Sequence, residues 1–158
     1  MKLNLGCGRD YKEGYVNVDI NKSFKTDYYL DLNKELYLLP SNQFEEIVAN
    51  NIIEHLDNPI DFLKELIRIS RNGGVIKIKV CHAFSYANVT DIQHKTNFTE
   101  NSFSFDLLEE YGLTNIELMD CKFTYAHGFR KFIPFKRFFK IFFNGIYDDI
   151  NFTFRVLK

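Results

Sequence analysis

Hydrophobic and polar residues alternate with a period of two in several stretches of this chain, a pattern that predicts β-strands. The clearest alternation lies in residues 75–80, Val-Ile-Lys-Ile-Lys-Val, and in residues 149–157. Because every second residue of 75–80 is apolar, this strand should have one buried face and one partly polar face. Shorter apolar runs predict four further strands, over residues 2–6, 15–19, 44–49 and 115–125.

A second pattern, with apolar residues three and four positions apart, predicts a helix over residues 59–71. Asn72-Gly73-Gly74 follows it, and residues that tolerate a left-handed backbone are expected to end such a helix. Two more helices are predicted. One covers residues 99–111, beginning near Thr99 or Asn101 and ending at Gly112, and the other covers 129–143 with a break or restart at Pro134.

Strands that alternate with helices predict the α/β class, and here a three-layer, doubly wound, mostly parallel sheet with helices on both faces. The last two strands, 115–125 and 149–157, could pair as an antiparallel edge. A chain of 158 residues is suited to one domain, so residues 1–158 are expected to form a single unit.

The composition of the chain argues against several classes of protein. Lys plus Arg is 20 and Asp plus Glu is 21, a balance that gives no global argument for nucleic-acid or membrane binding. Cys7, Cys81 and Cys121 are too few and too widely spaced for a disulfide framework, which favours reduced thiols and a cytoplasmic protein. Cys7, Cys81 and His82 lack the spacing of metal ligands, so no metal is expected. The immediate N-terminal strand and the lack of a long apolar run predict neither a signal peptide nor a membrane span.

The strongest candidate site lies in the first twenty residues. Gly6 and Gly8 follow the first strand, and Asp19 ends the second. Glycine has no Cβ, so the backbone at this turn can approach a ligand closely. An acid at the end of the next strand can accept hydrogen bonds from ribose hydroxyls. This arrangement predicts a site for a nucleoside-containing cofactor at the carboxyl ends of parallel strands.

These residues resemble the class I S-adenosylmethionine-dependent methyltransferases. Leu3-Asn4-Leu5-Gly6-Cys7-Gly8 is similar to their glycine motif and Asp19 to their acid after the second strand. Residues 44–56, with Glu54-His55-Leu56, and Arg71-Asn72-Gly73-Gly74 resemble later blocks in the same order, over about residues 2–80. The short form most resembles small predicted methyltransferases linked to sugar modification. The resemblance implies a Rossmann-like fold and the cofactor S-adenosylmethionine, with these cofactor-binding residues: Asn4, Gly6, Cys7, Gly8, Asp19, Asp31, Leu32 and Asn50.

The chain departs from the family pattern in three ways. Asn4 stands where many members have an acid, and no third glycine follows Gly8. Ten residues separate Gly8 from Asp19, fewer than a crossover helix needs, so the first helix should be either very short or replaced by a turn at Tyr11-Lys12-Glu13-Gly14. The same shortness argues against a dinucleotide site, which requires G-x-G-x-x-G and an acid about twenty residues further on.

The segment 81–98 follows the strand at 75–80 and should therefore lie over the crevice at the carboxyl ends of the strands. His94, with His82 or Asp91, is the candidate for receiving a proton from the acceptor, because an imidazole titrates near neutrality. His94-Lys95-x-x-Phe98-Thr99 resembles a motif of some small methyltransferases. The predicted function is methyl transfer to a small-molecule or glycan acceptor, at oxygen; the alternative is a non-catalytic S-adenosylmethionine-binding or scaffold protein.

Residues 129–143 are both aromatic and basic, with five Lys or Arg and no acid. The simplest interpretation is a helix that packs Phe side chains on the sheet and exposes its basic residues. Alternatives are a membrane surface, a lipid-linked or phosphate-bearing sugar, or a homodimer contact. The segment contains no nucleic-acid recognition motif, so a nucleic-acid partner is the weaker alternative.

Overall fold

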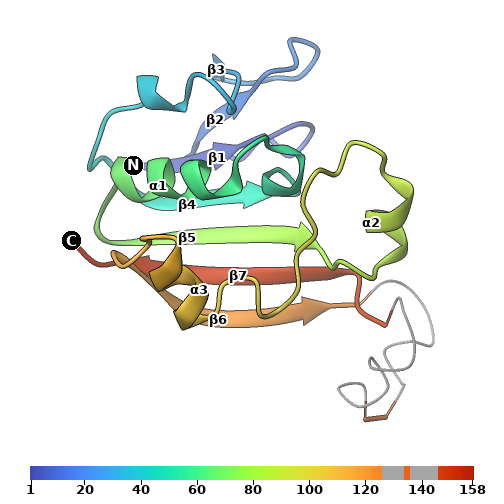
Figure 1. Cartoon of the computed structure of the whole chain (residues 1–158). Coiled ribbons are helices and arrows are strands. Elements are labelled where there is room, and N and C mark those ends of the chain that lie inside the picture. The colour runs from blue at the N-terminus through green and yellow to red at the C-terminus, as the bar shows by residue number, and fades with distance from the viewer. Residues whose placement is uncertain (126–133, 136–145) are drawn as a thin grey trace.

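The computed structural model describes residues 1–125, 134–135 and 146–158. A mixed sheet of seven strands runs through it in the order β3-β2-β1-β4-β5-β7-β6 (Figure 1). Strands β1 to β5 pair in parallel, and β7 is antiparallel to both β5 and β6. The α/β class and the mostly parallel sheet with an antiparallel C-terminal pair are therefore confirmed. The strands are β1 Lys2–Leu5, β2 Val16–Asp19, β3 Tyr28–Tyr29, β4 Phe44–Asn50, β5 Ser70–Cys81, β6 Ile116–Thr124 and β7 Asp149–Val156.

The helix predicted over 59–71 is α1 (Pro59–Ile69), and its first turn explains where it begins. The side chain of Asn58 accepts hydrogen bonds from the backbone N–H groups of Ile60 and Asp61, and Pro59 occupies the first helical position, where no N–H is needed. The predicted end was wrong. The backbone is already extended at Ser70, which pairs with β4, so Asn72-Gly73-Gly74 lies within β5.

The helix predicted over 99–111 is shorter in the structure, where α3 covers Phe105–Glu110. Polar residues before it form turns instead: Ser102 Oγ accepts from the Thr99 N–H, and the Asn101 carbonyl accepts from the Ser104 N–H. Such local bonds compete with helix formation. The predicted end at Gly112 holds, since Gly112 has a φ of +70°. The other helices are short: η1 Leu36–Leu38, η2 Ile53–His55 and α2 Tyr86–Thr90.

Cross-strand registers sort the side chains of the sheet into two faces. One row is apolar from end to end, and the adjacent row, one residue along each strand, is mostly polar. The apolar row consists of Val18, Leu5, Ala49, Ile78, Phe152 and Cys121. The adjacent row consists of Asn17, Asn4, Val48, Lys77, Thr153 and Asp120.

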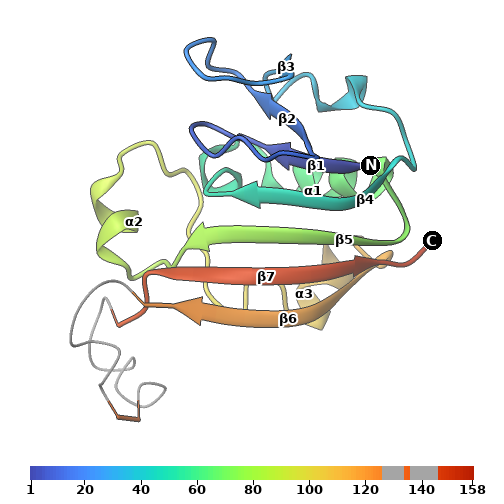
Figure 2. The ribbon, with the colours of Figure 1, turned by 180° about the vertical axis from the view of Figure 1, so that it is seen from behind.

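Helices α1 and α3 both cover the apolar face, and the sheet lies in front of them when the molecule is seen from behind (Figure 2). The described residues place no helix across the strands of the polar face, whereas the sequence predicted helices on both faces. On that face Lys77 pairs with Glu46 at 3.0 Å, and Lys79 pairs with Asp149 at 2.9 Å. The helix predicted over 129–143, with its membrane, sugar and dimer alternatives, lies outside the described residues except for 134 and 135.

The first connection, residues 6–15, contains turns and no helix, so of the two predicted alternatives the turn is the correct one. The Cys7 N–H donates to the Val18 carbonyl and the Asp10 N–H to the Cys7 carbonyl. At the other end of the sheet, the edge strand β6 has an irregular register between Leu118 and Asp120.

Candidate functional site

The glycine turn after β1 is held by the acid at the end of β2. Gly6 and Gly8 have φ values of +60° and +49°, a left-handed conformation that favours glycine. A Cβ on Gly6 would lie 2.0 Å from Cδ1 of Ile52, whereas a Cβ on Gly8 would meet open space. The Gly8 N–H donates to Asp19 Oδ2 at 2.7 Å, and the Asn21 N–H donates to Oδ1 at 2.8 Å. The carboxylate of Asp19 therefore has a fixed orientation beside the turn.

Asn4 and Cys7, which the sequence predicted to be cofactor-binding residues, are buried beneath the surface beside this turn. Asn4 is buried and donates to the carbonyl of Asp10 at 2.8 Å and to Asn17 Oδ1 at 2.9 Å. Cys7 is also buried, and burial raises the pKa of its thiol. Neither side chain lines the pocket described next; Asn4 instead links the turn to β2, and the Cys7 thiol donates to the Lys25 carbonyl at 3.8 Å.

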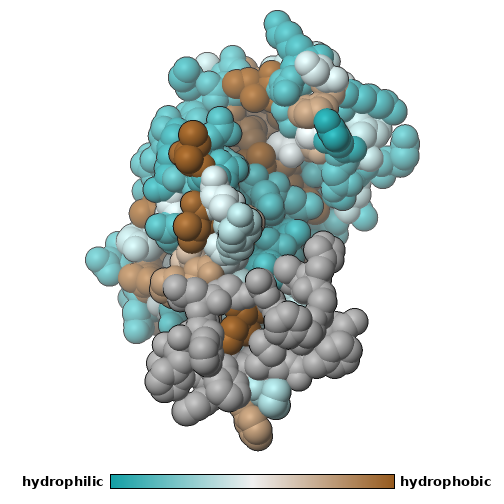
Figure 3. Space-filling model, turned by 90° about the vertical axis from the view of Figure 1, so that its right-hand side faces the viewer, coloured by the Kyte–Doolittle hydropathy of each residue, from teal (hydrophilic) through white to brown (hydrophobic). Residues whose placement is uncertain are grey.

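A pocket of about 550 Å³ opens at the carboxyl ends of β1, β2 and β4. Figure 3 looks onto this end of the sheet, where apolar surface lies between hydrophilic surroundings. Gly6, Asp19 and Asp31 contribute to one side, and the segment after β5 contributes to the other. The remaining lining residues are Ile20, Leu30, Leu32, Asn33, Asn51, Ile52, His55, Leu56, Ile92, Gln93 and Lys95.

Three of the predicted cofactor positions meet at this pocket on the β2 side: Asp19, Asp31 and Leu32. Asp31 is oriented by its own loop, because Oδ1 accepts from the Asn33 N–H at 3.0 Å. The predicted Asn50 ends β4, but it is the next residue, Asn51, that lines the pocket. Asn51 has a φ of +53°, and this local turn, invisible in the hydrophobic pattern, determines which amide reaches the cavity.

The segment after β5 lies over the carboxyl end of the sheet, as predicted, and supplies Ile92, Gln93 and Lys95 to the pocket. Of the three predicted acceptor-side residues, His94 and Asp91 lie together, with His94 Nε2 3.7 Å from Asp91 Oδ2. His82 lies apart from them, buried against Phe84 with its Nε2 3.7 Å from Glu100. None of the three side chains lines the pocket.

The imidazole that does line the pocket belongs to His55, which stands edge-on to His94 with ring centroids 4.7 Å apart. Glu54 lies behind them and is fully buried. One carboxylate oxygen of Glu54 and one ring nitrogen of each histidine all lie within 4.8 Å of one another. Burial raises the pKa of the Glu54 carboxyl. Sequence reasoning noted Glu54-His55 and His94 separately but missed the cluster, because 38 residues separate the two histidines.

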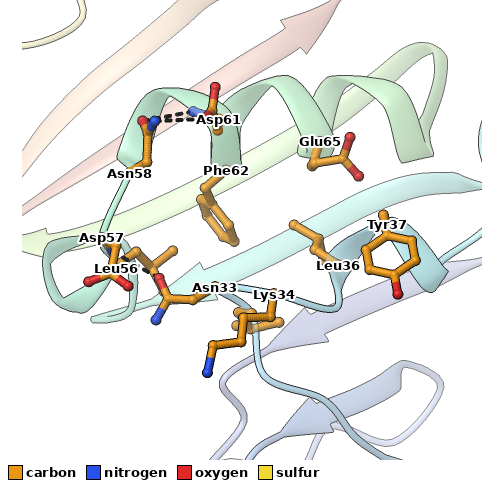
Figure 4. A pocket seen from close by; sticks show the side chains of 11 residues that line it. Asn33, Lys34, Leu36, Tyr37, Leu56, Asp57, Asn58, Asp61, Phe62 and Glu65 are labelled. Atoms are coloured by element: carbon orange, nitrogen blue, oxygen red, sulfur yellow. Dashed lines mark hydrogen bonds between the residues drawn. The ribbon is translucent and has the colours of Figure 1, made fainter.

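A smaller cavity of about 180 Å³ adjoins the first, between η1 and α1, and shares Leu32, Asn33 and Leu56 with it. Figure 4 shows the carboxylates of Asp57, Asp61 and Glu65 around its rim. Each of these acids has a partner. Asn58 Nδ2 donates to Asp61 at 2.6 Å, Arg68 pairs with Glu65 at 2.9 Å, and Lys95 of the segment after β5 pairs with Asp57 at 2.6 Å. They differ from Glu54 in being exposed to solvent.

Within residues 1–125, 134–135 and 146–158, no helix has the length and apolar character needed to cross a membrane. The sequence matches no protein-family model and no curated protein. Solved structures do resemble the fold. The chain is 18% identical to an S-adenosylmethionine-dependent methyltransferase of Archaeoglobus fulgidus, covering 98% of this chain and 85% of that one with a TM-score of 0.69.

A second similar structure is an S-adenosylmethionine-dependent methyltransferase of Mesorhizobium loti, 10% identical, covering 98% of this chain and 89% of that one, with a TM-score of 0.66. A third, an arsenic(III) S-adenosylmethionine methyltransferase of Chlamydomonas reinhardtii, is 15% identical, covering 99% and 63%, with a TM-score of 0.59. At these identities the likeness shows the fold, which is that of S-adenosylmethionine-dependent methyltransferases, and confirms the resemblance seen in the sequence at that level.

Proposed function

We propose that the protein binds S-adenosylmethionine in the 550 Å³ pocket and transfers its methyl group to an oxygen of a small-molecule or glycan acceptor. The observation that carries the proposal is the meeting of a left-handed glycine turn, the oriented carboxylate of Asp19 and an apolar wall at one cavity. A fold alone does not determine an activity, so the argument rests on this site.

The residues of the pocket fit the parts of this cofactor. Asp19 is 8% exposed and remains available as an acceptor for ribose hydroxyls, since each carboxylate oxygen accepts more than one hydrogen bond. Leu30 and Leu32 offer an apolar surface for the adenine ring, with Asp31 beside them.

When bound, S-adenosylmethionine supplies an electrophilic methyl group on a positively charged sulfur. The chain has to hold the acceptor in line with that group and to exclude water, and such positioning supplies much of the catalysis. Ile20 and Ile92 stand on the pocket lining with largely exposed side chains, 63% and 97%. These two residues are suited to covering a ligand that lies between them.

We assign the acceptor side to the segment after β5 together with His55 of η2. His55, Gln93 and Lys95 bring hydrogen-bonding groups to the same cavity, and a hydroxyl or glycan acceptor requires such groups. As the new bond between oxygen and the methyl carbon forms, the hydroxyl proton needs a base. His94, His82 and Asp91 remain the predicted candidates, and Asp91 is the most exposed of them, with a side chain 43% exposed.

Calorimetry with the full chain tests cofactor binding directly. We expect S-adenosylmethionine and S-adenosylhomocysteine to bind and NAD not to bind. Failure of both sulfur cofactors to bind at about 1 mM, a concentration that still detects weak complexes, would overturn the proposal. Release of S-adenosylhomocysteine in the presence of hydroxylated small molecules and sugars then tests transfer. Binding without turnover on a broad panel would favour the alternative, a non-catalytic binding or scaffold protein.

The variant Asp19→Ala tests the placement of the ribose. We expect it to weaken S-adenosylmethionine binding by about 1.5–3 kcal/mol, the range for hydrogen bonds to a charged group. Asp10→Ala is the matched control, because the Asp10 side chain is exposed and pairs with Lys12, within the same connection. Thermal unfolding of both variants separates a lost ligand contact from a loosened turn. Unchanged affinity of a folded Asp19→Ala would place the ribose elsewhere.

A further inference from the structure

The cluster of Glu54, His55 and His94 contains a buried polar atom that the fold leaves without a partner. Glu54 is 0% exposed. Its Oε1 accepts from the Cys81 N–H at 3.3 Å, but Oε2 has no hydrogen-bond partner among the described residues. A buried carboxylate oxygen without a partner is unfavourable, because it has lost its hydration without replacement. The cluster therefore lacks one positively charged or proton-donating group.

Hydrogen bonds around His94 determine which of its ring nitrogens is free. Asn88 donates through Nδ2 to the carbonyl of Ala83 at 3.0 Å and to Asn97 Oδ1 at 2.7 Å, so its Oδ1 faces His94. His94 Nδ1 lies 3.0 Å from that oxygen and therefore carries the hydrogen. In the neutral imidazole, Nε2 then keeps its lone pair. A carbonyl bound to the other ring nitrogen is the usual support of a histidine that ligates a metal.

From these contacts we propose that Glu54, His55 and His94 bind one divalent ion of the first transition series, of which zinc is the simplest example. Two imidazoles and one carboxylate form a donor set that suits such ions, and three protein ligands leave a coordination position open. Magnesium, which prefers oxygen ligands and keeps its waters, should bind more weakly. The ion would supply the partner that Glu54 Oε2 lacks among the described residues.

The position of the cluster beside the pocket suggests that the ion binds the acceptor, a role that rests on the proposed function. His55 lines the pocket, so the open coordination position would be reached from it by an oxygen of the acceptor. A bound cation polarises such an oxygen and fixes its position. A histidine that ligates a metal cannot also accept the hydroxyl proton. On this proposal His94 is a ligand, and Asp91, 3.7 Å from its Nε2, is left as the nearby candidate base.

Titration of the metal-free full chain with Zn²⁺ and with Co²⁺, without any cofactor, tests the site. We expect one ion per chain and a cobalt absorption spectrum of a four- or five-coordinate ion without a sulfur-to-cobalt band, since Cys7 and Cys81 are buried outside the cluster. His55→Asn and Glu54→Gln should each weaken Zn²⁺ binding at least tenfold. Asp61→Asn, an exposed acid of the neighbouring cavity, is the control and should bind as the wild type does.

Glu54 is buried, so Glu54→Gln could fail to fold, and His55→Asn, on a half-buried side chain, keeps the test decisive. The proposal is overturned if the wild-type chain binds neither Zn²⁺ nor Co²⁺ at about 100 µM, if His55→Asn binds as tightly as wild type, or if a sulfur band appears. Binding of S-adenosylmethionine without metal binding would reject this inference alone. Metal binding without either sulfur cofactor would reject the proposed function instead.

Discussion

The two faces of the sheet differ in how their side chains are accommodated: one is buried under helices and the other carries paired charges. On the face covered by α1 and α3, the side chains of β5 and β7 are apolar and fully buried, as Ile76 and Phe152 illustrate. On the opposite face β5 presents Lys77 and Lys79, which pair with Glu46 of β4 and Asp149 of β7. Parallel strands are normally covered on both faces. Here alternation along each strand takes the place of a second layer of helices across the described part of the sheet.

The comparison teaches where the stability of this fold resides. Burial of apolar area stabilises by about 25 cal/mol per Å², whereas an exposed ion pair contributes only about 0–1 kcal/mol. The covered face should therefore carry nearly all of the free energy of folding, while the polar face should mainly keep the sheet soluble. Substitutions on the two faces of a single strand test this directly.

The largest effect is expected from Phe152→Ala on β7. Phe152 is 0% exposed and packs edge-on against Phe103 with ring centroids 4.7 Å apart. Removing a buried phenyl ring leaves a cavity, and we expect the free energy of unfolding to fall by about 3–5 kcal/mol in urea titrations. Thr153→Ala, the next residue on the opposite face, is the control and should change it by less than about 1 kcal/mol. Equal losses at the two positions would break the comparison.

A smaller effect is expected from Tyr15→Phe, which removes the hydrogen bond that the Tyr15 hydroxyl donates to Glu46 on the polar face. This bond raises the pKa of Tyr15 to about 12 and lowers that of Glu46. A half-exposed bond of this kind should be worth about 1 kcal/mol of unfolding free energy near neutral pH.

The pH dependence of that difference follows from the two shifts. The pKa of Glu46 is lowered on folding, so its contribution is present above the unfolded value of about 4.3 and is lost as pH falls through the folded value. The raised pKa of Tyr15 keeps the bond intact up to the unfolded value of about 10, and the contribution disappears as pH rises through about 12. Urea titrations of both proteins across pH measure this. A difference that instead grew at either extreme would contradict the assignment, and Tyr28→Phe, on an exposed ring, should show none.

The smallest effect is expected from Lys79→Ala, which breaks the 2.9 Å pair with Asp149. The Lys79 side chain is 36% exposed, so solvent screens the pair, and the loss should be under about 1 kcal/mol. Raising salt from about 0.1 M to about 1 M should shrink even this loss. A loss as large as that of Phe152→Ala would mean that the polar face carries stability after all.

The alternation of apolar and polar residues predicted most of the strands, because the two faces of each strand differ in burial. The alternating run at 75–80 indicated both β5 and its polar face. The helix α1 was recognisable from its apolar spacing and from Asn58-Pro59. The prediction of a helix from residue 99 was wrong because Thr99 and Asn101 resemble helix-capping residues, whereas the local hydrogen bonds of residues 99–104 form turns. Strand β3 is two residues long and exposed, so it shows no alternation of apolar and polar residues. It is defined by its pairing with β2.

The residues of the candidate site also fall into two groups, those with a local sequence signal and those without one. Gly6 and Asp19 were predictable because a turn and a strand end have local signatures. The choice of Asn51 over Asn50 depends on one left-handed residue, and the meeting of Glu54 with His94 depends on how a long loop folds back. Such contacts between segments distant in sequence leave no periodic trace. They are set by tertiary packing, which a single sequence does not display.

The irregular register of β6 bears on how the molecule behaves in a crowded solution. An edge strand of nine residues offers unpaired backbone groups to which another chain could add. The shift between Leu118 and Asp120 interrupts that row, and the charges of Glu117 and Lys122 oppose a second strand there. At the opposite edge, β3 has two residues and is too short to pair stably with a strand of another chain. In the described part of the sheet, both edge strands therefore have features that oppose the addition of another strand.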